Sequence, residues 1–158
     1  MAHKSTPKMQ RREGLQTKSA EDRDCVIDPA YGGGGLKCIL IDRNGGMRAE
    51  AVCVQERKLV EQVLLVLVKM LKEEGCTFSA LKGIGVRKGG ESFSMVRGAY
   101  AIANALAWSL TIPTMAISAW EREEDAQRAV RVFNKKRQFH LLIPEYRREP
   151  NITLPKKA

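Results

Sequence analysis

The sequence lacks the long apolar runs, histidine pairs and paired cysteines by which many protein classes are recognised. A membrane-spanning helix needs about 20 consecutive apolar residues, and no stretch approaches that length. The basic N-terminal residues have no apolar segment behind them, so they do not resemble a secretory signal. We therefore expect a cytoplasmic protein with no membrane partner.

Cysteine and histidine are too few and too scattered to indicate a catalytic or metal centre. Zinc sites usually show clustered ligands, whereas the only two histidines are His3 and His140 and no C-x-x-C pair occurs. No cysteine or serine has an evident base partner for nucleophilic catalysis. We predict no catalytic, metal-binding or cofactor-binding residue, and reduced, mostly buried thiols. The four cysteines are Cys25, Cys38, Cys53 and Cys76.

The composition that remains is that of an ordinary globular protein with a basic excess. The chain has 158 residues, 44% of them hydrophobic, which is enough for one domain with its own core. Lysine and arginine total 27 against 18 acidic residues, giving a formal net charge of +9. Such a charge suits a polyanionic partner such as RNA, but it is also common on proteins that bind no nucleic acid.

Three zones of the chain differ in composition. Residues 1–24 are polar and almost free of large apolar side chains, which predicts a disordered basic arm. Residues 25–144 carry nearly all of the apolar periodicity and form the predicted lobe. Residues 145–158 contain two prolines and end in a basic stretch, so we expect an extended tail.

The lobe alternates short apolar runs with helical segments. An Asn-Gly turn at Asn44 and Gly45 joins two of the runs as a hairpin. Three antiparallel strands followed by strand–helix–strand units predict an α/β fold with a mixed five-stranded sheet. The predicted order is β-β-β-α-β-α-β, with an extra helix and a short C-terminal segment, FHLLIP, as a further strand candidate. The predicted strands are 25–28, 36–42, 47–54, 80–86 and 114–118.

Three helices are predicted between and after these strands. The first, 56–74, consists of good helix formers. The second, 93–110, has Ser92 as its N-cap. The third begins at a capping box formed by Ser118 and Glu121.

The first of these helices is apolar on more than one side. Its centre reads VLLVLV, Val63 to Val68, whereas a helix that covers one face of a sheet is apolar along one stripe. Two interpretations stay open. Either the fold covers both sides of the helix, or one side packs on the sheet and the other contacts a partner protein.

The loops between strands and helices offer weak candidates for phosphate or metal chemistry. The glycine-bearing loop 83–90 holds Arg87 and Lys88 before a helix start, a position that suits phosphate. It lacks the G-K-[ST] of a Walker loop and is better explained as a structural turn. Metal-dependent nucleases need several converging carboxylates, but only Asp28 and Asp42 end strands, and Arg87 ends the next one.

Basic residues cluster in the C-terminal part of the last predicted helix. If this face binds RNA, they would contact phosphates in a salt-dependent manner. A solvated helix face beside a basic tail explains them at least as well, and few aromatic residues are present for base stacking. The candidate RNA-contact residues are Arg128, Arg131, Lys135, Lys136 and Arg137.

One continuous stretch, SFSMVRGAYAIANALAWSLTIPTMAIS from Ser92 to Ser118, resembles a known family. It is similar to TsaB (YeaZ) proteins, in which G-x-G-P-G-S-F-T-G-L-R precedes an alanine-rich helix, then G-I-P and a strand ending in serine. The segment IPEYRREP also resembles the family's closing P-x-Y-x-R-x-P. The resemblance covers residues 25–118 and, more loosely, the tail. The matching motif residues are Ser92, Phe93, Ser94, Arg97 and Pro113.

The sequence departs from the family pattern at loops that face nucleotide in actin-like ATPases. Residues 89–91 read G-G-E in place of G-P-G, and Met95 replaces the glycine that follows the threonine. The first strand runs into D-P-A at 28–30 instead of D-T-S. These changes argue against a nucleotide hydrolase. The family also has a second lobe, for which we expect no room in this chain.

The resemblance implies a single actin-like (RNase H-like) lobe that acts as a non-catalytic accessory subunit. TsaB proteins bind TsaD, which transfers threonylcarbamoyl to adenosine 37 of certain tRNAs in t6A biosynthesis, and they form homodimers through a similar surface. The expected partner is therefore a TsaD-like catalytic subunit, with a TsaE-like ATPase, a homodimer and tRNA contact within the complex as further expectations. The interface candidates are Leu59, Val63, Val66, Met70, Val96, Tyr100 and Asn104.

Two alternatives to the accessory role stay open. One is a basic RNA-binding module, motivated by the basic cluster of the last helix. The other is a divergent nucleotide hydrolase or metallopeptidase, against which the altered loops and the missing histidine pair count.

Overall fold

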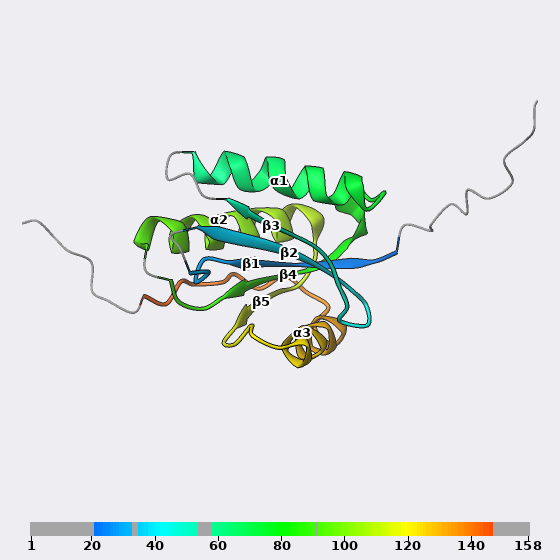
Figure 1. The fold of residues 1–158 in the computed structure, drawn as a ribbon. Coiled ribbons are helices and arrows are strands. Elements are labelled where there is room, and N and C mark those ends of the chain that lie inside the picture. Colours follow the sequence, from blue (N-terminus) through cyan, green and yellow to red (C-terminus); the bar gives the residue numbers. More distant parts are fainter. Residues whose placement is uncertain (1–20, 33–34, 54–57, 91, 147–158) are drawn as a thin grey trace, which may run out of the picture.

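The computed structural model describes residues 21–32, 35–53, 58–90 and 92–146. Within these ranges the chain forms one sheet with helices on both of its faces (Figure 1). The predicted basic arm and C-terminal tail lie almost entirely outside the described residues, so both stay predictions.

Five strands form the sheet: β1 (Arg23–Asp28), β2 (Leu36–Asp42), β3 (Met47–Cys53), β4 (Leu81–Arg87) and β5 (Thr114–Ile117). Their order across the sheet is β3-β2-β1-β4-β5. The first three strands pair antiparallel, and β4 and β5 continue the sheet parallel to β1. This arrangement confirms the mixed five-stranded α/β sheet that the sequence predicts.

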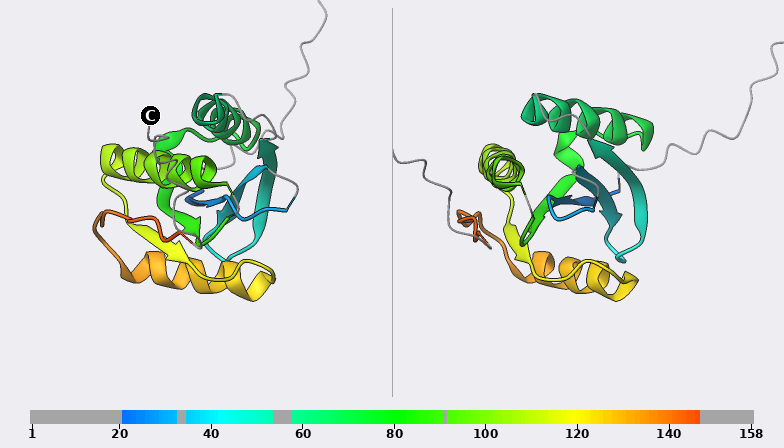
Figure 2. Two further views of the ribbon diagram at one scale, coloured as in Figure 1. Left: turned by 90° about the vertical axis from the view of Figure 1, so that its left-hand side faces the viewer. Right: turned by 60° about the vertical axis from the view of Figure 1, so that its left-hand side comes forward.

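Three helices cover the sheet: α1 (Leu59–Glu73), α2 (Phe93–Leu110) and α3 (Glu123–Lys135). Helices α1 and α2 lie side by side on one face, and α3 lies on the opposite face (Figure 2). A single 3-10 turn, Phe78–Ala80, precedes β4. No helix in the described ranges is long and apolar enough to cross a bilayer.

Apolar side chains fill the space on both sides of the sheet. The larger cluster lies beneath α1 and α2, and the smaller one lies between the sheet and α3. Two glycines of β4 make room on the α3 side, because a Cβ at Gly83 would lie 2.5 Å from Phe133 and one at Gly85 would lie 2.5 Å from Ile117. Close packing of α3 therefore depends on the glycines of the GIG sequence in β4.

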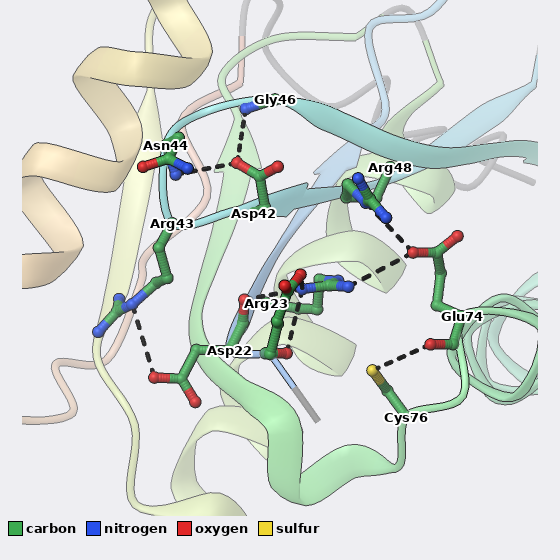
Figure 3. A network of polar contacts seen from close by, with 10 residues as sticks. Asp22, Arg23, Asp42, Arg43, Asn44, Gly46, Arg48, Glu74 and Cys76 are labelled. Atoms are coloured by element: carbon green, nitrogen blue, oxygen red, sulfur yellow. Dashed lines mark hydrogen bonds and ion pairs between the residues drawn. The ribbon is translucent and has the colours of Figure 1, made fainter. Parts of the chain in front are cut away.

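The hairpin between β2 and β3 closes through the predicted Asn-Gly turn. The Asp42 carboxylate accepts hydrogen bonds from the backbone N–H groups of Asn44 and Gly46, both at 2.9 Å (Figure 3). Gly45 has a φ of 83°, in the left-handed region that glycine adopts without strain. Asp42 is therefore a turn-forming residue in this structure.

Strand β1 begins two residues before the predicted start, with two charged residues inside the fold. Arg23 and Asp24 are only 1% and 0% exposed. The sequence places them in the arm because residues 1–24 are polar and almost free of large apolar side chains. Arg23 does have a partner, since its Nη2 lies 3.5 Å from the Glu74 carboxylate, which Arg48 Nε also contacts at 3.3 Å (Figure 3).

Helix α3 begins later than the predicted capping box, so that prediction is wrong. The acid that caps the helix is Asp125, whose carboxylate accepts hydrogen bonds from the backbone N–H groups of Glu121 and Arg122 at 2.9 and 3.0 Å. These bonds hold the pKa of Asp125 below its usual value. Ser118 and Glu121 have the spacing of a capping box, but they lie before α3, which begins at Glu123.

The segment FHLLIP forms no strand, in contrast to the prediction. Its backbone hydrogen bonds go to side chains instead of to a neighbouring strand. Asn104 of α2 accepts from the Leu142 N–H at 2.8 Å and donates to the Leu142 carbonyl at 2.9 Å. The Thr114 hydroxyl likewise bonds both the N–H and the carbonyl of His140. Side-chain amides and hydroxyls thus replace the sheet ladder here.

Candidate protein interface and strand ends

The carboxyl ends of β1 and β4 bring one acid and one arginine together. Arg87 Nη1 lies 3.1 Å from Asp28 Oδ2, and the other Asp28 oxygen accepts a hydrogen bond from the Ala30 N–H at 2.9 Å. Asp28 is 2% exposed. Arg87 Nη2 also reaches the Glu121 carboxylate at 3.6 Å. The strand-end carboxylate is therefore neutralised and held by its own chain.

The loop after β4 is packed against the β1 end. Gly90 has a φ of 135°, and a Cβ there would lie 2.8 Å from both the Pro29 carbonyl oxygen and Val96. Lys88, a phosphate candidate from the sequence, has its Nζ 3.1 Å from the Glu145 carboxylate. Among the described residues, no group of three His, Cys, Asp or Glu side chains is arranged to hold a metal ion.

The residues of the family-like motif mostly serve the start of α2. The Ser92 hydroxyl accepts a hydrogen bond from the Met95 N–H at 3.4 Å, which makes it the predicted N-cap. The Phe93 ring stacks on Tyr146 with centroids 3.9 Å apart. Ser94 and Arg97 are exposed, while Pro113 is buried behind the helix.

Most of the predicted interface residues lie in the core of the chain itself. Val63, Met70, Val96 and Tyr100 are 0–3% exposed, so none of them is available to a partner in this structure. Val66 is half-buried against the same core. The carboxamide of Asn104, also half-buried, is occupied by Leu142. The side chain of Leu59 lies outside the described residues.

The apolar residues that α1 does expose lie on its other side. Leu64, Leu65 and Val68 are 37%, 70% and 46% exposed. Their spacing of three and four residues places them together on one helix face. We call these three residues the α1 apolar stripe. The structure fixes this orientation through Val63 and Leu67, which are buried core positions, whereas the sequence alone does not show it.

Helix α2 presents a different surface on the same side of the sheet. Ala101 and Ala105 are exposed and four residues apart, and Trp108 continues this row at 71% exposure. Small side chains on a helix face let a second helix approach closely. The two helices therefore offer a partner large apolar residues on α1 and a shallow surface ending in a tryptophan on α2.

The predicted RNA-contact residues lie on the opposite side of the molecule, on and just after α3 (Figure 1). Arg128, Arg131, Lys135, Lys136 and Arg137 are all exposed. The Lys136 ammonium reaches the carbonyl of Thr114 at 3.5 Å. Across the described part of the chain, none of the five forms an ion pair within 4 Å.

Two buried groups on β1 have strongly shifted pKa values. Burial raises the pKa of Asp24 from 3.8 to about 7, with Arg43 opposing and Asp22 assisting this shift. Burial also raises the pKa of the Cys25 thiol to about 12. All four cysteines are free and buried, as the sequence predicts.

The strand order and the distribution of the helices define an RNase H-like, actin-like α/β lobe. One solved structure with this fold is YeaZ from Pseudomonas aeruginosa, with a TM-score of 0.53 and 24% identity over 61% of this chain and 44% of that chain. Another is an uncharacterized protein with similarity to peptidase YeaZ from Pseudomonas aeruginosa, with a TM-score of 0.53 and 24% identity over 61% of this chain and 43% of that chain. The resemblance to YeaZ noted from the sequence is therefore confirmed as a resemblance of fold.

The chain spans less than half the length of both YeaZ-like structures. RuvC from Thermus thermophilus is more distant, with a TM-score of 0.42 and 14% identity over 60% of this chain and 62% of that chain. The sequence matches no protein-family model and no curated protein sequence.

Proposed function

We propose that this chain is a non-catalytic accessory subunit of the TsaB kind, which binds a TsaD-like catalytic subunit and supports threonylcarbamoylation of adenosine 37 in tRNA. The observation that carries the proposal is the α1 apolar stripe on a lobe with the fold of YeaZ. A helix needs one apolar face to pack on its sheet, and α1 has a second. That second face suits a partner protein.

Covering the α1 apolar stripe with a partner protein lowers the free energy, because it removes apolar surface from water. Burying a leucine side chain fully stabilises by about 1.5–3 kcal/mol relative to leaving it in water. Leu65 is the most exposed of the three stripe residues, so a partner that covers it gains most there. Removing a leucine that is fully covered in the interface would forfeit an amount of this size.

The strand ends support a role without chemistry. Asp28 stands at the end of the central strand, but Arg87 and the Ala30 N–H occupy its two oxygens. The Arg87 guanidinium neutralises the carboxylate and so disfavours cation binding there. Asp28 thus takes part in contacts within the lobe itself.

Co-expression with the TsaD of the same organism, followed by affinity capture, tests the proposal. The double variant Leu65→Asp/Val68→Asp is expected to weaken capture by roughly 30-fold or more, because two charges would be desolvated in the interface. Leu141→Asp is the control for an added charge at an exposed apolar position, since Leu141 is 67% exposed and lies outside α1. Capture that fails for the wild-type chain, with or without nucleotide and a TsaE-like ATPase, contradicts the proposal.

The control also tests whether α1 is the face through which the chain binds TsaD. If Leu141→Asp weakens capture as much as the double variant does, binding stands but α1 is not its specific face. Sedimentation of the chain alone measures whether the same stripe forms a homodimer. Circular dichroism of each variant confirms that the exposed substitutions leave the fold intact.

A further inference from the structure

The charges of α3 are segregated along the helix. Its first turn holds the three acids Glu123, Glu124 and Asp125, which suit the positive end of the helix dipole. The following stretch, residues 126–140, contains five basic residues and no acid. The dipole favours cations only in the last turn of a helix, so it accounts for Lys135 but not for the basic residues in the middle of α3.

Three of the basic residues form a row on the solvent side of α3. Arg128, Arg131 and Lys135 follow one another at spacings of three and four residues, which places them on one face. The row extends about 10 Å along the helix axis at 1.5 Å per residue. We call these three residues the α3 basic row. The opposite side of α3 is apolar and buried, through Ala126, Ala129, Val130 and Phe133.

The α3 basic row forms no close ion pair with an acid of the lobe, although the charge of Arg128 helps to lower the pKa of Asp125 one turn earlier. No carboxylate lies within 4 Å of its three side chains in the part of the chain that the structure describes. Two exposed lysines of the lobe do have such partners, since Lys58 lies near Glu61 and Lys69 lies near Glu73. The row therefore leaves a concentrated positive field on the face opposite α1 and α2.

The surroundings of the row discriminate between polyanionic partners. A helix that binds an anionic membrane surface carries large apolar residues beside its basic ones, but in α3 every large apolar side chain faces the core or is partly buried. Stacking of unpaired bases uses exposed aromatic rings, and α3 exposes none. The row therefore presents two guanidinium groups and one ammonium group to solvent, and these groups bind phosphate oxygens.

We infer that the α3 basic row binds the phosphate backbone of RNA, without reading its base sequence. The inference does not depend on the proposed docking of α1, because the row lies on the other face of the sheet (Figure 2). Both faces are accessible at the same time. A chain docked through α1 would still present the row to an RNA.

Fluorescence anisotropy of the full chain with a labelled RNA hairpin, measured across a salt series, tests the inference. The triple variant Arg128→Gln/Arg131→Gln/Lys135→Gln is expected to bind at least about tenfold more weakly at low salt and to lose about three units of the log–log salt slope, one per contact. A hairpin of scrambled sequence is expected to bind equally well, since backbone contacts carry no sequence information.

The matched control is Lys58→Gln/Lys69→Gln/Lys72→Gln on α1, which changes the net charge by the same amount at three exposed positions. Its binding and salt slope are expected to stay close to wild type. Equal loss in both triple variants would assign binding to net charge and overturn the inference. No salt-dependent binding by the wild-type chain, or equal affinity for phosphatidylserine vesicles, would overturn it as well.

Discussion

Asp24 carries the sharpest prediction of this structure, because its carboxyl group is buried inside β1 without a hydrogen bond. Neither oxygen has a hydrogen-bonding partner among the described residues. One oxygen lies 2.9 Å from where a Cβ on Gly83 would stand, and Arg43 Nη1 approaches the other only to 3.9 Å. Burial of a carboxylate without close partners disfavours its charged form.

The size and sign of the effect follow from the pKa of Asp24, which rises from 3.8 to about 7 in the folded state. A shift of about 3 units corresponds to roughly 4 kcal/mol at 1.36 kcal/mol per unit. The folded state binds the proton more tightly than the unfolded state does. This stabilisation is therefore fully present below the unfolded pKa, and it is lost as pH rises through the folded pKa.

The variant Asp24→Asn removes the charge and keeps the shape of the side chain. Urea unfolding followed by circular dichroism is expected to show the variant more stable than wild type by up to about 4 kcal/mol at about pH 8.5. At about pH 4.5, where the wild-type carboxyl is mostly protonated in the folded state, the difference is expected to shrink to about 1 kcal/mol.

Asp125→Asn serves as the control, because backbone hydrogen bonds lower the pKa of Asp125 instead of raising it. Its stability contribution is lost only as pH falls below the unfolded pKa, so this variant is expected to show a constant loss over the same pH window. The reasoning is refuted if Asp24→Asn is less stable than wild type at alkaline pH. That result would mean that Arg43 stabilises the ionised carboxylate more than burial destabilises it.

Two further predictions concern contacts that hold the lobe together. Arg87→Ala leaves the buried Asp28 carboxylate without its partner and is expected to destabilise the fold by about 3 kcal/mol in urea unfolding at neutral pH; a loss below about 1 kcal/mol would contradict the burial argument. Asn104→Ala removes both hydrogen bonds to Leu142, each worth about 1 kcal/mol, and is expected to speed amide exchange at Leu142 by roughly 30-fold. Unchanged exchange there would show that other contacts hold the segment.

The sheet could be predicted from the sequence because its signals are local. The apolar runs that form β1, β2 and β4 are bounded by glycine or proline, and Asn44–Gly45 specifies the hairpin turn that joins β2 to β3. The N-cap Ser92 is likewise a local signal, and it was predicted correctly. Such elements depend mainly on residues that are neighbours in the sequence.

The wrong predictions, for the start of β1 and for the FHLLIP segment, concern structure that depends on residues distant in the sequence. Arg23 and Asp24 enter the fold because β1 is central and covered on both faces, which no local charge pattern indicates. The FHLLIP segment has the composition of a strand, but Thr114 and Asn104 take its backbone bonds. In both cases the deciding partner lies far away along the chain.

The orientation of α1 illustrates why the sequence alone could not show which apolar residues of this helix are exposed. An apolar helix centre such as VLLVLV does not show which residues face the sheet, and the family resemblance does not fix the helix rotation either. The structure fixes it through Val63 and Leu67, which are fully buried. Leu64, Leu65 and Val68 are then the exposed residues of VLLVLV that a partner could contact, and Leu65 is the most exposed of them.

The sheet separates two surfaces of opposite character, and this separation makes the two proposals independent. The α1 apolar stripe and the α3 basic row lie on opposite faces, with the buried strand β1 between them. Mutations more than about 7–10 Å apart without shared partners usually have additive effects. Substituting the stripe should therefore leave the salt slope of RNA binding unchanged, and substituting the row should leave TsaD capture unchanged. Coupling between the two effects would mean that partner and RNA meet on one continuous surface, and the division of the lobe into two binding faces would have to be abandoned.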